Sequence, residues 1–464
     1  MSNKVASSFR DPSGFMFTRG EKLFRQVNQV YKEDYDLLMS SGLYDKLVKL
    51  KWMVVHQETN ESPLVPEIAY KVIEPNKVPF ISYPYEWSFS QLRIAALLTL
   101  AIEKQSLNFG MSLKDASAYN IQFVNNSPVL IDTLSLTKYR EGEPWVAYRQ
   151  FCQHFLGPLA LMSKVDLQLQ KLLINFIDGI PLELCSKLLP GSTRINSGLM
   201  MHIHMHASAQ QRANKEQSLG KNSPVKSANI SKTGRLALIE SLESTIKGLN
   251  CKINGELWAD YYANTNYSTD AFEEKKKLVF ETVSALDPHM IYDLGANTGI
   301  FSLEAAKIPG SLVISSDIDP EAVEINYQEL KKQKIENVLP LVIDLTNPTP
   351  SIGWDNAERG SFLTREKADV VMALALIHHL AIANNLPLSS IAASFSKLGK
   401  YLLLEFVPKE DSQVVRLLSS REDIFPNYTL EGVKQEFSGY YKLIKEIPIS
   451  GSKRTLLLFE TSGK

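Results

Sequence analysis

Short apolar runs and segments with helical spacing follow one another from residue 290 to residue 460. A short apolar run at 290–292 precedes a glycine-containing segment, 293–299, and a stretch with helical spacing, 300–307, follows it. Short apolar runs separated by segments with helical spacing predict parallel strands joined by helices. The other runs that predict strands are 311–316, 338–343, 368–376, 400–405, 443–449 and 453–460. A short Ser-Gly-Ser turn joins the last two runs, which predicts a terminal antiparallel hairpin.

The first 206 residues predict an α+β domain. Apolar and polar residues alternate around Arg19-Gly20, which predicts two short strands within 15–25. The segment 22–50 has amphipathic helical spacing, and the longest apolar run lies around 94–102. That run has the length of a buried helix and is too short to cross a membrane.

A polar segment separates the two parts of the chain. Residues 207–234 are rich in Ser, Asn, Gln and Lys and contain few bulky apolar residues, so we expect a flexible, exposed linker. Apolar residues at helical spacing follow in 235–249 and predict a helix that leads into the next domain. We therefore predict an N-terminal domain at 1–206, a linker at 207–234 and a second domain at 235–464.

The turn that follows the run at 290–292 favours ligand binding. It contains Asp293, Gly295, Asn297 and Gly299. Glycine permits positive φ and a close approach of the backbone to a ligand, and Asn is a side-chain-bearing residue that tolerates the left-handed region. Turns of this kind between a strand and a helix also bind NAD, FAD or phosphate, so the turn alone does not identify the ligand.

Acidic residues at the ends of later strands narrow the choice. Asp317 follows the second predicted strand, where a carboxylate can accept both hydroxyls of a ribose, and Asp344 follows the third. Together with the glycine turn, this pattern resembles the class I S-adenosylmethionine (SAM) methyltransferases over roughly 255–464. The resemblance implies a Rossmann-like domain in which Asp293, Gly295, Asn297 and Gly299 form the methionine pocket. It also implies that Asp317 binds the ribose and Asp344 lies near the adenine.

Two neighbouring segments have two open interpretations each, and a third has one. Tyr262, Asn266 and Tyr267 lie in an aromatic, Asn-rich stretch that either covers the cofactor or packs a helix against the sheet. Trp354 lies in a Pro-containing loop and either shelters the adenine or a substrate ring or packs on the surface. We expect the lysines at 275–277 to lie on a solvated helix face.

A histidine pair, His378 and His379, follows the fourth predicted strand. In this fold that position faces the transferred methyl group, and an imidazole with a pKa near neutrality could accept a proton from the acceptor. We expect His379 slightly ahead of His378 in this role. The alternative is that the imidazoles only bind the edge of the sheet.

The first domain contains a second set of polar residues with a recognisable spacing. Asp115, Asn120 and Asp132 surround an expected hairpin at 121–131 and resemble the catalytic loop and metal-binding Asp of kinase-like phosphotransferases. The histidine expected two residues before Asp115 is Leu113, and no Gly-x-Gly-x-x-Gly loop lies upstream. The spacing therefore predicts a degenerate, catalytically idle kinase-like domain, with an unrelated α+β domain as the alternative.

The chain as a whole is similar to a family of bacterial methyltransferases of the nodulation-protein type. The similarity rests on the segments Gly-Leu-Met-Met-His-Ile-His-Met-His at 198–206 and Ala-Leu-Ala-Leu-Ile-His-His-Leu at 373–380. His202, His204 and His206 alternate, but no Cys or carboxylate lies close to them in the sequence, so we predict no metal site.

Charge and cysteine content set limits on the partners. Lys and Arg total 50 and Asp and Glu total 51, a net charge of −1 that gives no strong signal for nucleic acid or a membrane. Three widely separated cysteines, Cys152, Cys185 and Cys251, predict reduced thiols in a cytoplasmic protein.

We therefore predict a cytoplasmic two-domain SAM-dependent methyltransferase. Its acceptor, a small molecule or a macromolecule, is not identified by the sequence, and we expect the first domain to recognise it. Two alternatives stay open. One is a kinase-like phosphotransferase with a regulatory SAM-binding domain, and the other is a non-enzymatic SAM-binding scaffold.

Overall fold

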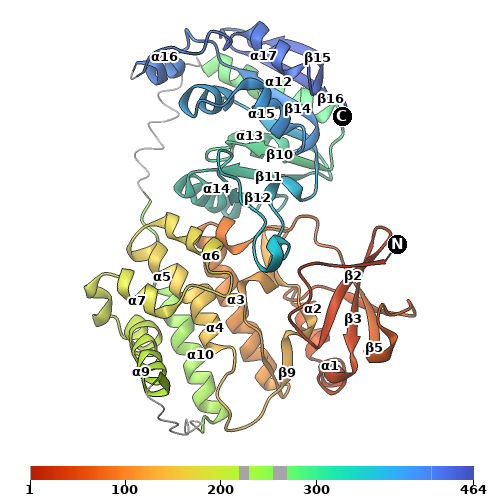
Figure 1. Ribbon diagram of the computed structural model, residues 1–464, viewed down its shortest axis with the longest axis vertical. Helices are drawn as coiled ribbons and strands as arrows, with labels where there is room; N and C mark the ends of the chain where they lie inside the picture. Colours follow the sequence, from red (N-terminus) through yellow and green to blue (C-terminus); the bar gives the residue numbers. More distant parts are fainter. Residues whose placement is uncertain (1, 219–228, 254–268, 420, 464) are drawn as a thin grey trace. The chain divides into compact units, whose positions relative to one another are not determined.

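A computed structural model describes residues 2–218, 229–253, 269–419 and 421–463 (Figure 1). The chain forms two compact units. The first comprises Met1–Lys252 together with the short segment Ser351–Arg359, and the second comprises Ile253–Pro350 and Gly360–Lys464.

The described part of the second unit is built on a seven-stranded sheet. The strand order is β12-β11-β10-β13-β14-β16-β15, and β16 is antiparallel to both of its neighbours while the other pairs are parallel. This order agrees with the expected parallel sheet that ends in an antiparallel hairpin. The strands are β10 (Met290–Leu294), β11 (Leu312–Asp317), β12 (Val338–Val342), β13 (Ala368–Ala373), β14 (Gly399–Phe406), β15 (Tyr441–Pro448) and β16 (Thr455–Thr461).

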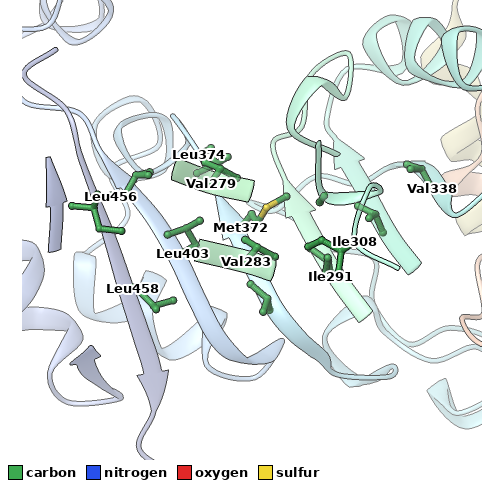
Figure 2. Close-up of a cluster of buried hydrophobic side chains, with 14 of the residues drawn as sticks. Val279, Val283, Ile291, Ile308, Val338, Met372, Leu374, Leu403, Leu456 and Leu458 are labelled. Carbon is green, nitrogen blue, oxygen red and sulfur yellow. The ribbon is translucent and has the colours of Figure 1, made fainter. Parts of the chain in front are cut away.

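Helices connect these strands and cover the sheet. Because a parallel sheet is buried on both faces, its strands are apolar runs rather than alternating ones. Figure 2 shows Val279 and Val283 beside Ile291, Met372 and Leu403 of the central strands, in one buried core cluster. The helices are α12 (Thr269–Ser284), α13 (Ile300–Ala305), α14 (Pro320–Gln333), α15 (Leu388–Phe395), α16 (Ser412–Leu418) and α17 (Leu430–Phe437).

The first unit begins with an antiparallel sheet in the order β1-β2-β3-β5-β4. The expected hairpin around Arg19-Gly20 is confirmed, since β2 pairs with β3 across this turn. The expectation of a helix from residue 22 is wrong for its first part, because residues 22–28 form a strand that places Phe24 in the core, and the first α-helix begins at Lys32. The elements are β1 (Ser2–Lys4), β2 (Gly14–Arg19), β3 (Lys22–Asn28), α1 (Lys32–Ser40), α2 (Leu43–Lys49), β4 (His56–Thr59) and β5 (Ala69–Pro75).

A long buried helix, α3 (Phe89–Asn108), follows the sheet. It begins at a capping box in which Ser88 and Gln91 bind each other's backbone N–H groups. Two short strand pairs come next, β6 (Met111–Leu113) with β9 (Leu136–Lys138) and β7 (Ile121–Val124) with β8 (Ser127–Leu130). The expected hairpin at 121–131 is therefore present.

The rest of the first unit is helical. A helical stretch runs from α4 through the π-helix η6 to α5. A second π-helix, η9, contains His202 and His204. These elements are α4 (Tyr148–Phe151), η6 (Cys152–Leu156), α5 (Gly157–Lys164), α6 (Leu172–Asn175), α7 (Leu182–Leu188), α8 (Ser197–Leu199), η9 (Met200–Met205), α9 (His206–Ser218) and α10 (Lys232–Lys247).

The expected linker at 207–234 is wrong at both ends. Its first part is helical as far as Ser218, because Ala, Gln, Arg, Lys and Glu favour a helix even without an apolar face. Ile230 forms an isolated bridge with Gly142, so this end of the expected linker is also tied to the first unit.

The boundary between the units lies after α10 rather than before it. Arg235 of α10 lies with its Nη1 atom 3.6 Å from the Glu103 carboxylate of α3, and both side chains are buried. The Ser112 hydroxyl and the Leu113 N–H also donate to Glu103. Burial raises the pKa of Glu103 to about 7, so much of the carboxylate's charge depends on these partners. The spacing of apolar residues in the sequence predicted the helix α10, but it did not show that α10 packs against α3.

Replacing Arg235 with methionine should destabilise the first unit by about 3–5 kcal/mol at pH 8, because Glu103 would keep its charge in the core without a cation. Lys104→Met is the matched control. Lys104 pairs with Glu240 between the same two helices, but both side chains are exposed, so its loss should cost less than about 1 kcal/mol. Urea unfolding measures both variants, and equal small losses would contradict the buried tie.

Candidate functional site

The turn between β10 and α13 has the backbone geometry that its sequence predicts. Gly295, Asn297 and Gly299 have φ values of 70°, 52° and 83°, all in the left-handed region. A Cβ atom at Gly299 would lie 2.4 Å from the Asn326 Oδ1 atom of α14, so this position excludes larger residues. A Cβ atom at Gly295 would lie 2.9 Å from the Leu376 side chain, which brings the segment after β13 against the turn.

Asp293 stabilises the turn through the hydrogen bonds of its carboxylate. Its carboxylate is buried and accepts a hydrogen bond of 2.6 Å from the Ser302 hydroxyl at the start of α13. The hydroxyls of Ser302 and Ser315 lie 2.7 Å apart, and the Asn326 amide donates to Ser315. Burial raises the pKa of Asp293 to about 6. Together these contacts join β10, β11, α13 and α14 beneath the glycine turn.

Asp317 lies at the end of β11, beside the same turn. Its Oδ2 atom accepts the Asn297 N–H at 2.8 Å and its Oδ1 atom accepts the Asp319 N–H at 3.0 Å. A carboxylate has about four acceptor positions, so each oxygen keeps capacity for a ligand hydroxyl. Burial raises the pKa of Asp317. The neighbouring Ile318 is 52% exposed at this edge, an apolar surface that the sequence analysis missed.

Asp344 follows β12 and is half-buried. Its Oδ1 atom accepts the N–H groups of Thr346 and Asn347 and the Thr346 hydroxyl, which fixes the loop after the strand. Because β10, β11 and β12 are parallel neighbours, Asp293, Asp317 and Asp344 lie at one edge of the sheet. The expected cofactor residues Tyr262 and Asn266, and Tyr267 beside them, lie outside the described residues.

The two histidines after β13 differ in exposure. His378 is 1% exposed, its Nδ1 atom has no hydrogen-bond partner among the described residues, and burial lowers its pKa to about 3. His379 is half-buried, and burial lowers its pKa as well. The ring centroids lie 4.2 Å apart. Ala375, just before them, has a φ of 50°, an unfavourable conformation for a residue with a side chain.

Lys275 is not on a solvated face, contrary to expectation. It is 2% exposed, and its Nζ atom donates to Glu405 Oε2 at the end of β14 over 2.6 Å. It lies four and eight residues before Val279 and Val283, so helical spacing places it on the buried face of α12. Only Lys277 of the three lysines is fully exposed.

A small pocket of about 200 Å³ lies between the connections that follow β13 and β14. Ala381, Leu388 and Tyr428 are among its lining residues. Arg421 holds one wall by donating to the carbonyl groups of Ile382 and Ala383. The pocket therefore adjoins the helical turn that begins at His379.

Comparison with known proteins places the chain in a family. The chain is 35% identical to nodulation protein NoeA from Rhizobium meliloti (strain 1021) over 462 residues, which cover 99% of this chain and 96% of the relative. This chain belongs to the NoeA family. The expected similarity to nodulation-type proteins is therefore confirmed. No protein-family model matches the chain.

Solved structures give weaker similarities. Magnesium protoporphyrin IX methyltransferase from Synechocystis PCC 6803 with bound SAH matches 45% of this chain and 94% of its own, at 18% identity and a TM-score of 0.32. The N-methyltransferase NodS from Bradyrhizobium japonicum WM9 matches 43% of this chain and 89% of its own, at 12% identity and a TM-score of 0.31. The bifunctional kinase-methyltransferase WbdD matches 42% of this chain and 38% of its own, at 18% identity and a TM-score of 0.28. TM-scores this low carry no argument, so the fold is assigned from the order and direction of the strands.

The kinase-like residues of this NoeA-family chain lie close together in the first unit, but one acid is already paired. Arg25 of β3 forms a largely buried ion pair with Asp132, whose Oδ1 atom also accepts the Leu134 N–H. Asp115 accepts from the Ser117 N–H and the Gln150 amide, and burial, followed by the nearby charge of Asp132, raises its pKa. Asn120 ends the short helix η4 (Ala118–Asn120) between them.

Two further expectations concern Trp354 and the histidine run. Trp354 is 74% exposed in the segment that belongs to the first unit, where Glu358 accepts two hydrogen bonds from Arg10.

His202 forms hydrogen bonds through both ring nitrogens, with the hydroxyls of Tyr148 and Ser241. His204 likewise binds the hydroxyls of Ser186 and Thr193.

Within the described ranges, no helix is long and apolar enough to cross a membrane. The same residues contain no group of three or more His, Cys, Asp or Glu side chains placed to hold a metal ion.

ATP with Mg²⁺ should leave the melting temperature of the NoeA-family protein unchanged, because Arg25 holds Asp132, the acid that corresponds to the Mg²⁺ ligand of kinases. Differential scanning fluorimetry with and without ATP and Mg²⁺ measures this, and Asp132→Ala is the control. A clear rise that disappears in Asp132→Ala would contradict the idle site.

Proposed function

We propose that this protein is a SAM-dependent methyltransferase that acts on an acceptor still to be identified. The observation that supports this most is Asp317, whose two oxygens retain acceptor capacity beside the positive-φ turn 293–299. A nucleoside needs this pair of features, a carboxylate for its ribose hydroxyls and a backbone that approaches closely.

The remaining parts of SAM have matching residues along the same edge. Ile318 offers an exposed apolar surface for the adenine, and Asp344 follows the next strand. The positive φ values of Gly295 and Gly299 let the backbone approach the methionine end closely, and Asp293 fixes the turn beneath it. SAM would supply an electrophilic methyl group on a sulfonium.

The protein's contribution to the chemistry is mostly alignment and exclusion of water. With SAM held by Asp317 and the turn 293–299, its methyl group would pass to a lone pair of the acceptor, and the carbon–sulfur electrons would stay on sulfur. The acceptor's proton then passes to a base. His379 suits this role because it is half-buried and its lowered pKa keeps it neutral at pH 7. His378 is buried and supports the segment after β13.

The first unit is proposed to recognise the acceptor. A phosphotransferase function is less well supported because Asp132 is held by Arg25. A non-enzymatic scaffold would bind SAM without transferring its methyl group. A screen of metabolites and macromolecules with radiolabelled SAM separates the scaffold from the enzyme.

Asp317→Ala should weaken SAM and S-adenosylhomocysteine (SAH) binding by at least about tenfold, since hydrogen bonds to a charged group contribute roughly 1.5–3 kcal/mol each. Asp369→Ala is the matched control. Asp369 also accepts two backbone N–H groups, those of His289 and Met290, but at the amino end of β10. Titration calorimetry on both folded variants measures this. Unchanged affinity in Asp317→Ala would remove the ribose assignment.

Once an acceptor is known, His379→Gln should lower kcat by about a hundredfold or more, since general-base catalysis contributes roughly 10²–10⁴-fold. Its affinity for SAM should not change. His378→Gln is the comparison, and we expect its buried position to make the loss mainly one of stability. Steady-state rates and urea unfolding of both variants separate the two effects. An unaltered kcat in His379→Gln would exclude the base.

A further inference from the structure

Leu376 lies between the glycine turn and the histidine pair. A Cβ atom built on Gly295 would lie 2.9 Å from Leu376 Cδ1, 3.5 Å from its Cγ and 3.6 Å from its Cβ, so the side chain packs along this glycine. The Leu376 carbonyl group accepts the N–H groups of His379 at 3.0 Å and Leu380 at 3.3 Å. One residue therefore contacts the turn through its side chain and holds the helical turn of His379 through its backbone.

Leu376 differs from its apolar neighbours in burial. Leu374 and Ile377 are buried, and Figure 2 shows Leu374 beside Val279 in the core cluster. Leu376 is only half-buried, and so is Gly295 on the turn. An apolar side chain that stays partly exposed beside this turn is available to a ligand that binds there. Packing of the core alone does not account for its place.

The residue before Leu376 has an unfavourable backbone conformation. Ala375 has a φ of 50°, whereas the other described non-glycine residues with positive φ are Asn, Asp and Lys. The short polar side chains of Asn and Asp can support this conformation by local hydrogen bonds, but a methyl group cannot. The surrounding structure must therefore hold Ala375 in the short connection between the end of β13 at Ala373 and the helical turn that begins at Ile377. Strain that is retained in this way is typical of segments with a functional position.

A ligand on the glycine turn would restrict this connection directly. It can favour one position of Leu376 only by interacting with that residue, and the Leu376 side chain lies against the turn itself. Because the carbonyl group of the same residue accepts from His379 and Leu380, an ordered Leu376 also orders the first helical turn after it. The coupling needs no path of intermediate residues, since one residue makes both contacts.

We propose that Leu376 is a positioning residue that couples occupation of the glycine turn to the placement of His379, and that the strained Ala375 keeps Leu376 in this position. The inference rests on the proposed function and deepens it, because the cofactor would order the segment that carries the proposed base. The acceptor would then meet a fixed imidazole only when SAM is bound.

Amide hydrogen exchange tests this coupling in the full-length protein without a known acceptor. SAH is the probe because it lacks the transferable methyl group. At saturating SAH, exchange at the amides of His379 and Leu380 should slow by roughly fivefold or more, since coupling between two sites typically amounts to about 5–150-fold. Mass spectrometry of peptides within 374–383 measures this, and peptides from α17 serve as the internal reference.

Substitutions of Leu376 separate its side chain from its backbone. Leu376→Ala removes the contact with Gly295 but keeps the carbonyl group that accepts from His379 and Leu380. At saturating SAH the slowing at these two amides should disappear. Leu376→Met should restore it, because a long, flexible apolar side chain can still reach the turn. Should Leu376→Ala fail to fold, Leu376→Val takes its place in the test.

Leu374→Ala is the matched control for packing. It removes a leucine side chain two residues earlier, from the core cluster rather than from the turn. It should lower the melting temperature, because it leaves a cavity in the core. The slowing of exchange by SAH at His379 and Leu380 should nevertheless remain.

Ala375→Gly tests the role of the strained residue. Glycine adopts positive φ without strain but also adopts many other conformations. The melting temperature should stay close to its original value, because the relief of strain offsets the greater freedom of the unfolded chain. In the SAH-free protein, exchange at His379 and Leu380 should become faster by about fivefold or more, the same order as the coupling.

Lys334→Gly is the matched control for this backbone change. Lys334 has a φ of 59° and is exposed at the C-terminal end of α14. Glycine is common at such helix ends, so the substitution should be tolerated. It should leave exchange at His379 and Leu380 unchanged.

Circular dichroism shows which variants are folded. Slowing that persists in folded Leu376→Ala would overturn the proposal, since SAH would then act on the histidine segment by another route. So would binding of SAH to the unaltered protein without any slowing, or an equal loss of slowing in Leu374→Ala. Unchanged exchange in Ala375→Gly would overturn the part assigned to Ala375. Failure of the unaltered protein to bind SAH in calorimetry would instead overturn the proposed function.

Discussion

Parallel pairing of β10 to β14 is the constraint on which the rest of the second unit depends. It forces the chain to leave each of these strands at the same edge of the sheet, so residues far apart in sequence become neighbours. Asp293, Asp317 and Asp344 are collected there because of this constraint. The positive φ values of Gly295 and Gly299 then let α13 begin directly behind the turn.

The buried ions near this edge need a reason other than stability. Buried ion pairs are often no better than apolar side chains of the same volume, because desolvation offsets the attraction. Lys275 and Glu405 replace apolar residues at the end of an otherwise apolar core, which has Val279 one turn away along α12. Their ion pair fixes α12 against the carboxyl end of β14.

The first unit combines kinase-like spacing with a different set of ion pairs. Asp115, Asn120 and the hairpin follow one another as the sequence indicates, yet Arg25 neutralises Asp132 from the antiparallel sheet. Its helix α10 is tied to α3 by the buried Glu103 and Arg235. The segment Ser351–Arg359 adds Glu358, which binds Arg10.

The sequence by itself determined the strands, the glycine turn and the acids at the strand ends, because local periodicity and backbone requirements depend on neighbouring residues. It also indicated the loop and hairpin around Asp115. Only the tertiary structure decided which polar side chains are buried, since a partner such as Glu405 for Lys275 lies 130 residues away in the chain. The ion pair of Arg25 with Asp132 also joins residues that are far apart in the sequence. The unit to which α10 belongs was likewise decided by the tertiary structure, because it depends on which residues cover the apolar face of this helix. Burial and pairing are properties of the packed chain, and a linear pattern does not record them.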